Sequence, residues 1–80
     1  MYLVYILKSE KDSHTYVGYT NNLVRRIAEH NSGQAISTRY RHPLKLILSE
    51  KFTDERSAKI RELYWKSGAG RRKLKELFQK

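Results

Sequence analysis

Two segments rich in β-branched and aromatic residues open the chain, with a short polar stretch between them. They are Tyr2–Lys8 and His14–Thr20, separated by residues 9–13. Segments of this composition favour strands, and so short a connection favours an antiparallel hairpin. The first segment carries Tyr5, and the second carries Tyr16 eleven residues later. If the hairpin register places both tyrosines on one face, their phenol groups lie close together.

Gly18 interrupts the second of these predicted strands. Glycine weakens a strand interior because it contributes no side chain to packing and loses more backbone entropy on folding than other residues. We therefore expect Gly18 to mark either a close approach of another group to the backbone or a β-bulge. Both explanations are open at this point.

A helix is predicted to follow the hairpin. Asn21 or Asn22 can cap its start, and Gly33 lies where it is expected to stop. Its apolar face is expected to contain Leu23, Val24, Ile27 and Ala28. Asn22, Arg26 and His30 recur at intervals of four residues, so they share a stripe beside that face.

A third strand and a second helix are predicted in the next part of the chain. The strand is Leu44–Leu48, with Lys51 as its outer limit. Thr53 or Asp54 can cap the helix, which is expected to end near Ser67. Its larger side chains fall on two faces, with Ile60, Leu63 and Tyr64 on one and Ala58, Glu62 and Trp65 on the other.

The chain is predicted to end in a short basic helix. Gly68 and Gly70 are expected to break the chain before it, and the helix itself covers residues 71–80. Its apolar anchors are Leu74, Leu77 and Phe78. The order β-β-α-β-α-α predicts an α+β fold, a small three-stranded antiparallel sheet flanked by helices, with residues 1–80 forming a single domain.

The composition limits the classes of function. Lys and Arg number 17 against 8 Asp and Glu, which gives a net charge of +9 and favours a polyanionic partner such as nucleic acid. The absence of cysteine excludes a disulfide framework, a zinc ribbon and a thiol nucleophile. The longest apolar run, Tyr2–Leu7, is too short to span a membrane and lacks the flanks of a signal peptide. We therefore expect a cytoplasmic protein that does not associate with membranes.

Five side chains could together cleave a phosphodiester bond: Tyr5, Tyr16, Arg26, His30 and Glu62. An arginine can clamp a phosphate and stabilise the charge that develops on it. A histidine can act as a general base or a metal ligand. A carboxylate such as that of Glu62 is the kind of oxygen ligand that Mg²⁺ prefers. The alternative role for Glu62 is an ion pair with a basic neighbour.

The spacing of these residues resembles that of the GIY-YIG nuclease superfamily. Leu3-Val4-Tyr5 stands in the place of its first motif, and Tyr16-Val17-Gly18 in the place of its second. Arg26 follows Tyr16 by ten residues, His30 follows one helical turn later, and Glu62 comes four residues after an alanine. The chain is most similar to small stand-alone bacterial members, which are related to the nuclease domain of an excision-repair protein. Leu3 and Val4 depart from the Gly-Ile of the first motif.

The resemblance implies a metal-dependent DNA endonuclease that selects irregular DNA structures, with a role in DNA repair or recombination. Glu62 would hold Mg²⁺ or Mn²⁺, and Arg26 would neutralise the phosphorane. Tyr5 or Tyr16, with His30 as a relay, would help to deprotonate the attacking water. A homodimer or a partner protein would assist target selection. Two alternatives are a non-catalytic nucleic-acid-binding module and an RNA-directed nuclease, with DNA the favoured partner.

Several further residues are expected to contact nucleic acid outside the catalytic set. They are Asn22 at the helix start, Arg39, Tyr40 and Arg41 in the basic loop, and Arg71, Arg72 and Lys73 near the carboxyl end. Tyr40 can stack on a base, and the basic side chains can follow the phosphate backbone. His14 is expected at the surface, and Tyr19 as a packing residue of the sheet.

Overall fold

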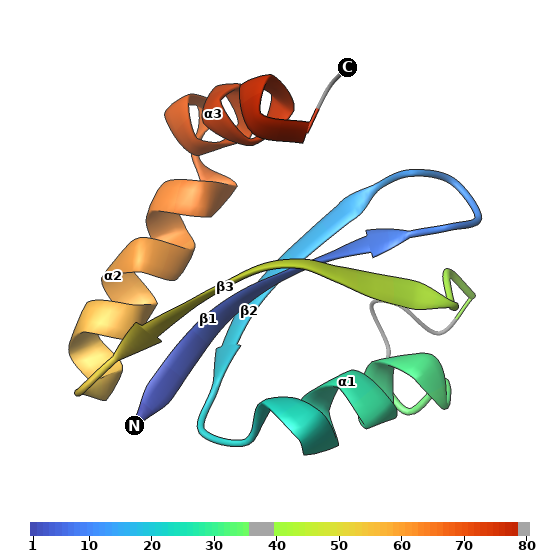
Figure 1. The fold of residues 1–80 in the computed structure, drawn as a ribbon, viewed down its shortest axis with the longest axis horizontal. Helices are drawn as coiled ribbons and strands as arrows, with labels where there is room; N and C mark the ends of the chain where they lie inside the picture. The colour runs from blue at the N-terminus through green and yellow to red at the C-terminus, as the bar shows by residue number, and fades with distance from the viewer. Residues whose placement is uncertain (36–39, 79–80) are drawn as a thin grey trace.

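The amino-terminal strand is the centre of the sheet. The structure, a computed structural model, describes residues 1–35 and 40–78. In chain order its elements are β1 (Tyr2–Ser9), β2 (Thr15–Thr20), α1 (Leu23–Asn31), β3 (Leu44–Phe52), α2 (Glu55–Lys66) and α3 (Gly68–Phe78). β1 pairs antiparallel with β2 on one side and with β3 on the other (Figure 1). This confirms the predicted α+β fold and its order of elements.

Helices cover both faces of β1. Because side chains alternate along a strand, Val4 and Ile6 point to one face, and Tyr5 and Leu7 point to the other. The first pair packs against α2 and α3, and the second pair packs against α1. Val4 through Leu7 are therefore all buried, which explains why this stretch is almost continuously apolar.

Asparagines hold both ends of α1. The Asn22 side chain caps its start by accepting a hydrogen bond from the Arg25 backbone N–H at 3.1 Å. At the other end Asn31 bonds both backbone groups of Leu44, accepting from its N–H at 2.6 Å and donating to its C=O at 3.2 Å. The contacts of Asn31 tie the end of α1 to the first residue of β3.

The apolar face predicted for α1 is only partly correct. Leu23 and Ile27 pack against the buried cluster of β1 and β3, but Val24 is 83% exposed, and Ala28 is also exposed and is not part of that cluster. Residues at positions i, i+4 and i+7 share one face of a helix, so His30 completes the face of Leu23 and Ile27. Of the stripe predicted to lie beside this face, His30 is therefore buried toward the sheet, whereas Asn22 is exposed.

Of the two faces predicted for α2, the one that contains Ala58 and Trp65 is buried. Ile60 and Leu63 are 60% and 58% exposed, whereas Ala58 and Trp65 are buried. A carboxylate on β3 explains this orientation, because Glu50 accepts hydrogen bonds from the Trp65 indole at 2.8 Å and from Arg61 Nε at 3.0 Å.

This contact also affects the ionisation of Glu50. Burial raises its pKa, but the hydrogen bonds from Arg61 and Trp65 outweigh burial, so the pKa lies below its ordinary value. Glu50 is therefore ionised at neutral pH and fixes the rotation of α2 about its axis.

The two glycines that were predicted to break the chain lie in the first turn of α3. The helix begins at Gly68, and Gly70 is buried against α2. A Cβ atom at Gly70 would come within 2.6 Å of the Trp65 Cα, so only glycine permits this approach of the two helices. Of the three predicted anchors, Leu74 is buried and packs in the core, while Leu77 and Phe78 are exposed.

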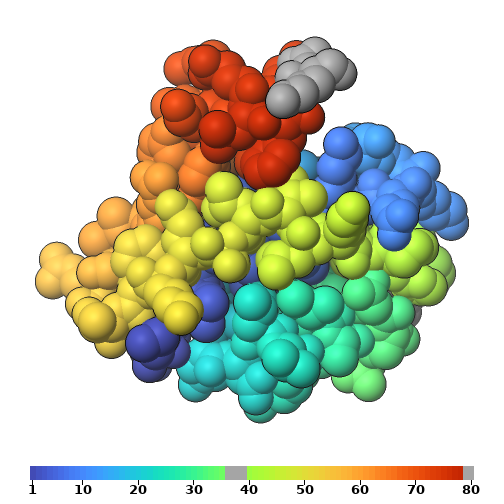
Figure 2. Space-filling view, viewed as in Figure 1, coloured from blue at the N-terminus to red at the C-terminus, as the bar shows by residue number. Residues whose placement is uncertain are grey.

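The space-filling view shows β3 as a band between the other layers. In Figure 2 its side chains lie between α2 and α3 on one side and α1 on the other. Within residues 1–35 and 40–78, no helix combines the length and the apolar character that crossing a membrane requires.

Candidate active site

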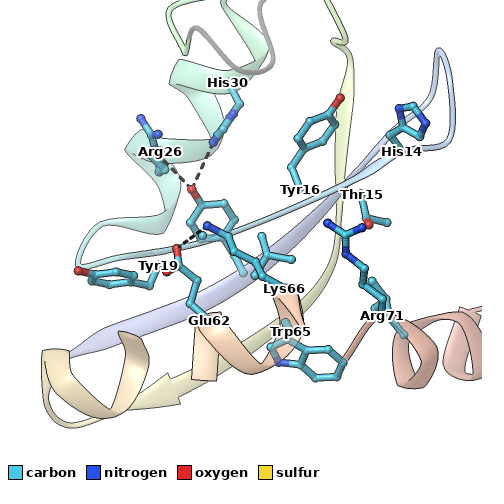
Figure 3. A pocket seen from close by; sticks show the side chains of 14 residues that line it. His14, Thr15, Tyr16, Tyr19, Arg26, His30, Glu62, Trp65, Lys66 and Arg71 are labelled. Carbon is cyan, nitrogen blue, oxygen red and sulfur yellow. Dashed lines mark hydrogen bonds and ion pairs between the residues drawn. The ribbon is translucent and has the colours of Figure 1, made fainter. Parts of the chain in front are cut away.

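A cleft of about 850 Å³ runs along the edge strand β2 (Figure 3). All five side chains proposed for catalysis line it: Tyr5, Tyr16, Arg26, His30 and Glu62. Figure 3 shows Arg26 and His30 approaching from α1, and Glu62 approaching from α2 on the other side. The cleft therefore gathers residues from three separate parts of the chain.

On one wall of the cleft, two side chains of α1 contact the Tyr5 hydroxyl. Arg26 Nε donates a hydrogen bond to it at 3.2 Å, and His30 Nε2 lies 3.2 Å from it (Figure 3). The Tyr5 and His30 rings meet edge to face, with centroids 5.9 Å apart. Tyr5 is buried, so these two partners determine the surroundings of its oxygen.

A carboxylate holds Arg26 in this position. Arg26 Nη1 donates to Glu29 Oε1 at 2.9 Å, one helical turn along α1. The guanidinium is thus held between Glu29 and the phenol of Tyr5. Arg25, the neighbour with the same charge, has a mostly exposed side chain 3.8 Å from Glu29 and is not among the residues that line the cleft.

His30 is favoured in its neutral form. Burial lowers its pKa below the ordinary value of 6.5, and the adjacent Arg26 lowers it further. A neutral imidazole has one nitrogen that accepts a hydrogen bond. When Nε2 is that nitrogen, the Tyr5 hydroxyl accepts from Arg26 and donates to His30.

Gly18 makes room for the Tyr5 ring. The two residues are directly opposite each other in the β1–β2 register, and a Cβ at Gly18 would lie 2.7 Å from Tyr5 Cζ. Of the two explanations considered for Gly18, the close approach of another group is therefore correct, and that group is the Tyr5 side chain. Tyr16 pairs with Leu7 in the same register, which places it on the face that Tyr5 occupies.

Glu62 stands on the opposite wall of the cleft, on α2. Its side chain is only 15% exposed, and one carboxylate oxygen lies 3.4 Å from Lys66 Nζ. Across the described residues, no group of three or more His, Cys, Asp or Glu side chains is arranged to hold a metal ion. Mg²⁺ is commonly bound by one or two carboxylates, with water and substrate phosphate completing its shell. A single partly buried carboxylate in an open cleft is compatible with this mode of Mg²⁺ coordination.

The cleft carries a positive balance of charge. Among the described residues that line it are three side chains with a permanent positive charge, Arg26, Lys66 and Arg71, and one carboxylate, Glu62. Because a concave surface concentrates the field of its charges, such a cleft attracts an anionic ligand.

A family model described as the GIY-YIG catalytic domain matches residues 1–75. The chain belongs to the GIY-YIG family. This is a nuclease family, and its members generally depend on divalent metal ions.

Relatives of this GIY-YIG chain match it over most of its length. UPF0213 protein CPE1444 of Clostridium perfringens is 46% identical, with 100% of this chain and 86% of the relative covered. UPF0213 protein YazA of Bacillus subtilis is 41% identical, with 92% and 73% covered. The solution NMR structure of UPF0213 protein BH0048 from Bacillus halodurans is 35% identical, with a TM-score of 0.58 and 98% and 86% covered.

The residues expected to bind nucleic acid are spread over the GIY-YIG domain. Arg71 lines the cleft, whereas Arg72 and Lys73 are exposed on α3 and are not among its lining residues. Asn22 is exposed, and its side-chain oxygen caps α1.

The predicted basic loop is described only in part. Arg39 lies outside the described residues, and Tyr40 is exposed. Arg41 is engaged within the protein, because its Nη1 lies 3.0 Å from Asp12 and its carbonyl accepts a hydrogen bond from Ser9 Oγ at 2.6 Å. It therefore helps to hold the β1–β2 turn.

Other side chains of the cleft were not predicted from the sequence. Lys66 and Tyr19 both line it, as does His14. The Tyr19 hydroxyl donates to Glu55 at 3.2 Å, and this bond raises its pKa above the ordinary value. Two sequence signals were present: Tyr19 follows the second motif directly, and Lys66 lies one helical turn after Glu62.

Proposed function

We propose that this GIY-YIG domain is a metal-dependent endonuclease that hydrolyses phosphodiester bonds in DNA. The observation that carries the proposal is the Tyr5 hydroxyl, which is bound by Arg26 and lies beside His30. This oxygen faces a cleft to which another helix contributes Glu62. A phenol with a cationic donor and a neutral base beside it is arranged to move a proton.

Tyr5 and His30 form the proton path in this proposal. An unperturbed tyrosine has a pKa of roughly 10, so its use as a base requires groups that stabilise the phenolate or remove its proton. Arg26 supplies a cation at the oxygen, and neutral His30 accepts the hydroxyl hydrogen. The attacking water then gives its proton to the Tyr5 oxygen while the Tyr5 proton passes to His30. Tyr16 stands on the same face, where it can orient the water or the phosphate.

Arg26 and Glu62 act on the phosphate. Arg26 uses Nε and Nη1 for Tyr5 and Glu29, so its Nη2 group is the one we expect to reach a phosphate oxygen. Glu62 is the residue that would hold Mg²⁺ or Mn²⁺. When bound there, the ion supplies Lewis-acid stabilisation of the developing negative charge on the phosphate oxygens.

The surface charge supports nucleic acid as the substrate. The net charge of +9 and the cations of the cleft favour a phosphate backbone, and nothing in the sequence resembles a helix that reads bases. We therefore propose selection by DNA shape, with a homodimer or a partner protein assisting, and a role in DNA repair or recombination in the cytoplasm.

A panel of labelled nucleic acids tests this proposal. Single-stranded, duplex, flap, bubble and four-way-junction DNAs, with matching RNAs, are incubated with the full chain in Mg²⁺, in Mn²⁺ and in EDTA. We expect DNA products only with metal, a preference for one irregular shape, and no products from Glu62→Gln. The control is Glu76→Gln, which neutralises an exposed carboxylate on α3.

Each alternative result has a distinct meaning. Metal-dependent cleavage of RNA but not of DNA would show that RNA is the substrate. Binding without cleavage, unchanged in Glu62→Gln, would identify a non-catalytic binding module. Cleavage retained in Glu62→Gln would remove this residue from the active site.

A further inference from the structure

The carboxylate of the cleft is already paired with a cation. Lys66 Nζ lies 3.4 Å from Glu62 Oε2, and the two residues are one helical turn apart on α2. The two side chains differ in exposure, since Glu62 is 15% exposed and Lys66 is 49% exposed. Glu62 is thus held in place, while Lys66 has room to rotate toward solvent.

This pair lies inside the cleft and faces the catalytic groups. Both residues line it, and Figure 3 shows the Lys66 amine turned from α2 toward the interior of the cleft, where it meets the Glu62 carboxylate. The guanidinium of Arg26 is bound elsewhere, to Glu29 and Tyr5. Lys66 is therefore the cation of the cleft that forms an ion pair with Glu62.

We propose that Lys66 exchanges between two partners during the reaction. It pairs with Glu62 in the metal-free protein and moves to a phosphate oxygen of the substrate once a divalent ion occupies Glu62. This inference rests on the proposed function, because it takes Glu62 as the metal ligand and nucleic acid as the substrate.

The chemistry of lysine suits this exchange. Its ammonium group is a compact, strongly hydrated charge on a flexible four-carbon stem, whereas arginine forms a rigid bidentate fork. An i,i+4 ion pair that is half open to solvent is weak and is readily replaced by a divalent ion. A divalent ion also repels the ammonium, and the phosphates of a substrate in the cleft are anions that could then receive it.

The first test measures metal binding without catalysis. The ¹⁵N-labelled full chain is titrated with Mn²⁺, and broadening of the amide signals around residue 62 reports both the place and the affinity of the ion. The test variant is Lys66→Met. The matched control is Lys45→Met, which removes an exposed lysine of β3 outside the cleft.

Removal of the competing cation should tighten Mn²⁺ binding. We expect the Kd to fall by roughly fivefold in Lys66→Met, beyond any change in Lys45→Met, because the ion no longer displaces or repels an ammonium group. Lys66→Arg keeps the charge and should keep the Kd near that of the wild type. The same spectra show whether each variant is folded.

The second test measures where Lys66 acts when the metal is present. DNA affinity is measured on a hydrolysis-resistant phosphorothioate substrate, in EDTA and in Mg²⁺. In EDTA, Lys66→Met should bind DNA only slightly more weakly than Lys45→Met, because Lys66 is then held by Glu62 and acts only through the overall charge of the cleft. In Mg²⁺, Lys66→Met should bind several-fold more weakly than Lys45→Met, because it lacks the released cation.

Failure of this inference differs from failure of the proposed function. Equal Mn²⁺ affinity in Lys66→Met and Lys45→Met, or an effect of Lys66→Met on DNA binding that is the same with and without Mg²⁺, would overturn the exchange alone. Broadening that persists unchanged in Glu62→Gln, or that is absent near residue 62 in every variant, would overturn the metal site itself and with it the proposed function.

Discussion

The ring of Tyr5 lies across the backbone of Gly18, its direct partner on the neighbouring strand. A Cβ at position 18 would come 2.7 Å from Tyr5 Cζ and closer still to the hydroxyl oxygen. The glycine of the second motif therefore accommodates the tyrosine of the first. This fit explains why a residue that weakens strands stands in the middle of β2.

Substitution of Gly18 by alanine should damage both stability and activity. The added methyl group must displace the Tyr5 ring, and such overpacking costs about 1–3 kcal/mol. Movement of the ring also shifts the hydroxyl away from Arg26 and His30, so cleavage should fall more than the loss of folded protein explains. Urea unfolding and single-turnover cleavage of the same preparation measure the two effects.

Two comparisons isolate the contact between Gly18 and Tyr5. Gly68→Ala adds a methyl group that meets only an Arg72 nitrogen at 3.6 Å, so it should be neutral or stabilise α3 by up to about 1 kcal/mol. In a Tyr5→Ala background, Gly18→Ala should cost little stability, because the ring is absent. An equal cost in both backgrounds would contradict the contact.

Removal of the Tyr5 hydroxyl alone should separate chemistry from packing. Tyr5→Phe keeps the ring over Gly18 and loses only the hydrogen bonds, so stability should change by about 1 kcal/mol. Cleavage should fall by roughly 10²-fold or more, the usual contribution of a positioned acid or base. Single-turnover rates at saturating DNA measure the loss.

Two other tyrosines serve as references for Tyr5. Tyr2→Phe changes a half-buried tyrosine that is not among the residues lining the cleft, so its rate should stay near that of the wild type. Tyr16→Phe changes a second phenol of the cleft. A larger loss in Tyr16→Phe than in Tyr5→Phe would transfer the role of base to Tyr16.

The stability of the protein should fall at acid pH because of His30. Burial and the neighbouring Arg26 lower the pKa of this residue below 6.5, the ordinary value to which it returns on unfolding. Between the two values the unfolded chain binds a proton that the folded protein does not. The stabilisation is therefore fully present above pH 6.5 and is lost as pH falls toward the folded-state pKa. Urea midpoints measured on both sides of pH 6.5 test this.

A second histidine provides the control for this titration. His30→Gln should flatten the pH dependence just below 6.5, because position 30 no longer binds a proton on unfolding. His42→Gln changes an exposed histidine and should keep the slope of the wild type. The same slope in His30→Gln and the wild type would show that His30 does not cause the acid instability.

Local sequence signals predicted the order of elements and the caps of two helices. Asn22 caps α1 and Asp54 caps α2, each through a bond to a nearby backbone N–H, so these signals depend on neighbours in sequence. The short connection between the first two strands correctly predicted the hairpin, whose register places Tyr5 and Tyr16 on one face. The spacing of the motifs was enough to select five residues that line one cleft.

Contacts between elements that are distant in the sequence determine the features that the sequence did not predict. α2 has two faces with apolar side chains, and its buried face is set by Glu50 on β3, which holds Trp65 and Arg61. Gly70 was predicted to break the chain because glycine disfavours helices. Its actual role is close packing against α2, which depends on a neighbouring helix and is not visible in the local sequence. The Lys66–Glu62 pair follows helical spacing, but its place in the cleft depends on the rotation of α2.

Two adjacent arginines at the start of α3 should differ in their contribution to DNA binding. Arg71 lines the cleft, whereas Arg72 is exposed and is not among its lining residues. A lysine or arginine that contacts a phosphate contributes about one unit to the slope of log affinity against log salt. Arg71→Gln should therefore weaken DNA binding and reduce this slope by about one, and Arg72→Gln should change both much less. Affinities measured for the same DNA across a series of salt concentrations test the difference. Equal effects of the two substitutions would place the path of the phosphate backbone on the outer face of α3 instead of in the cleft.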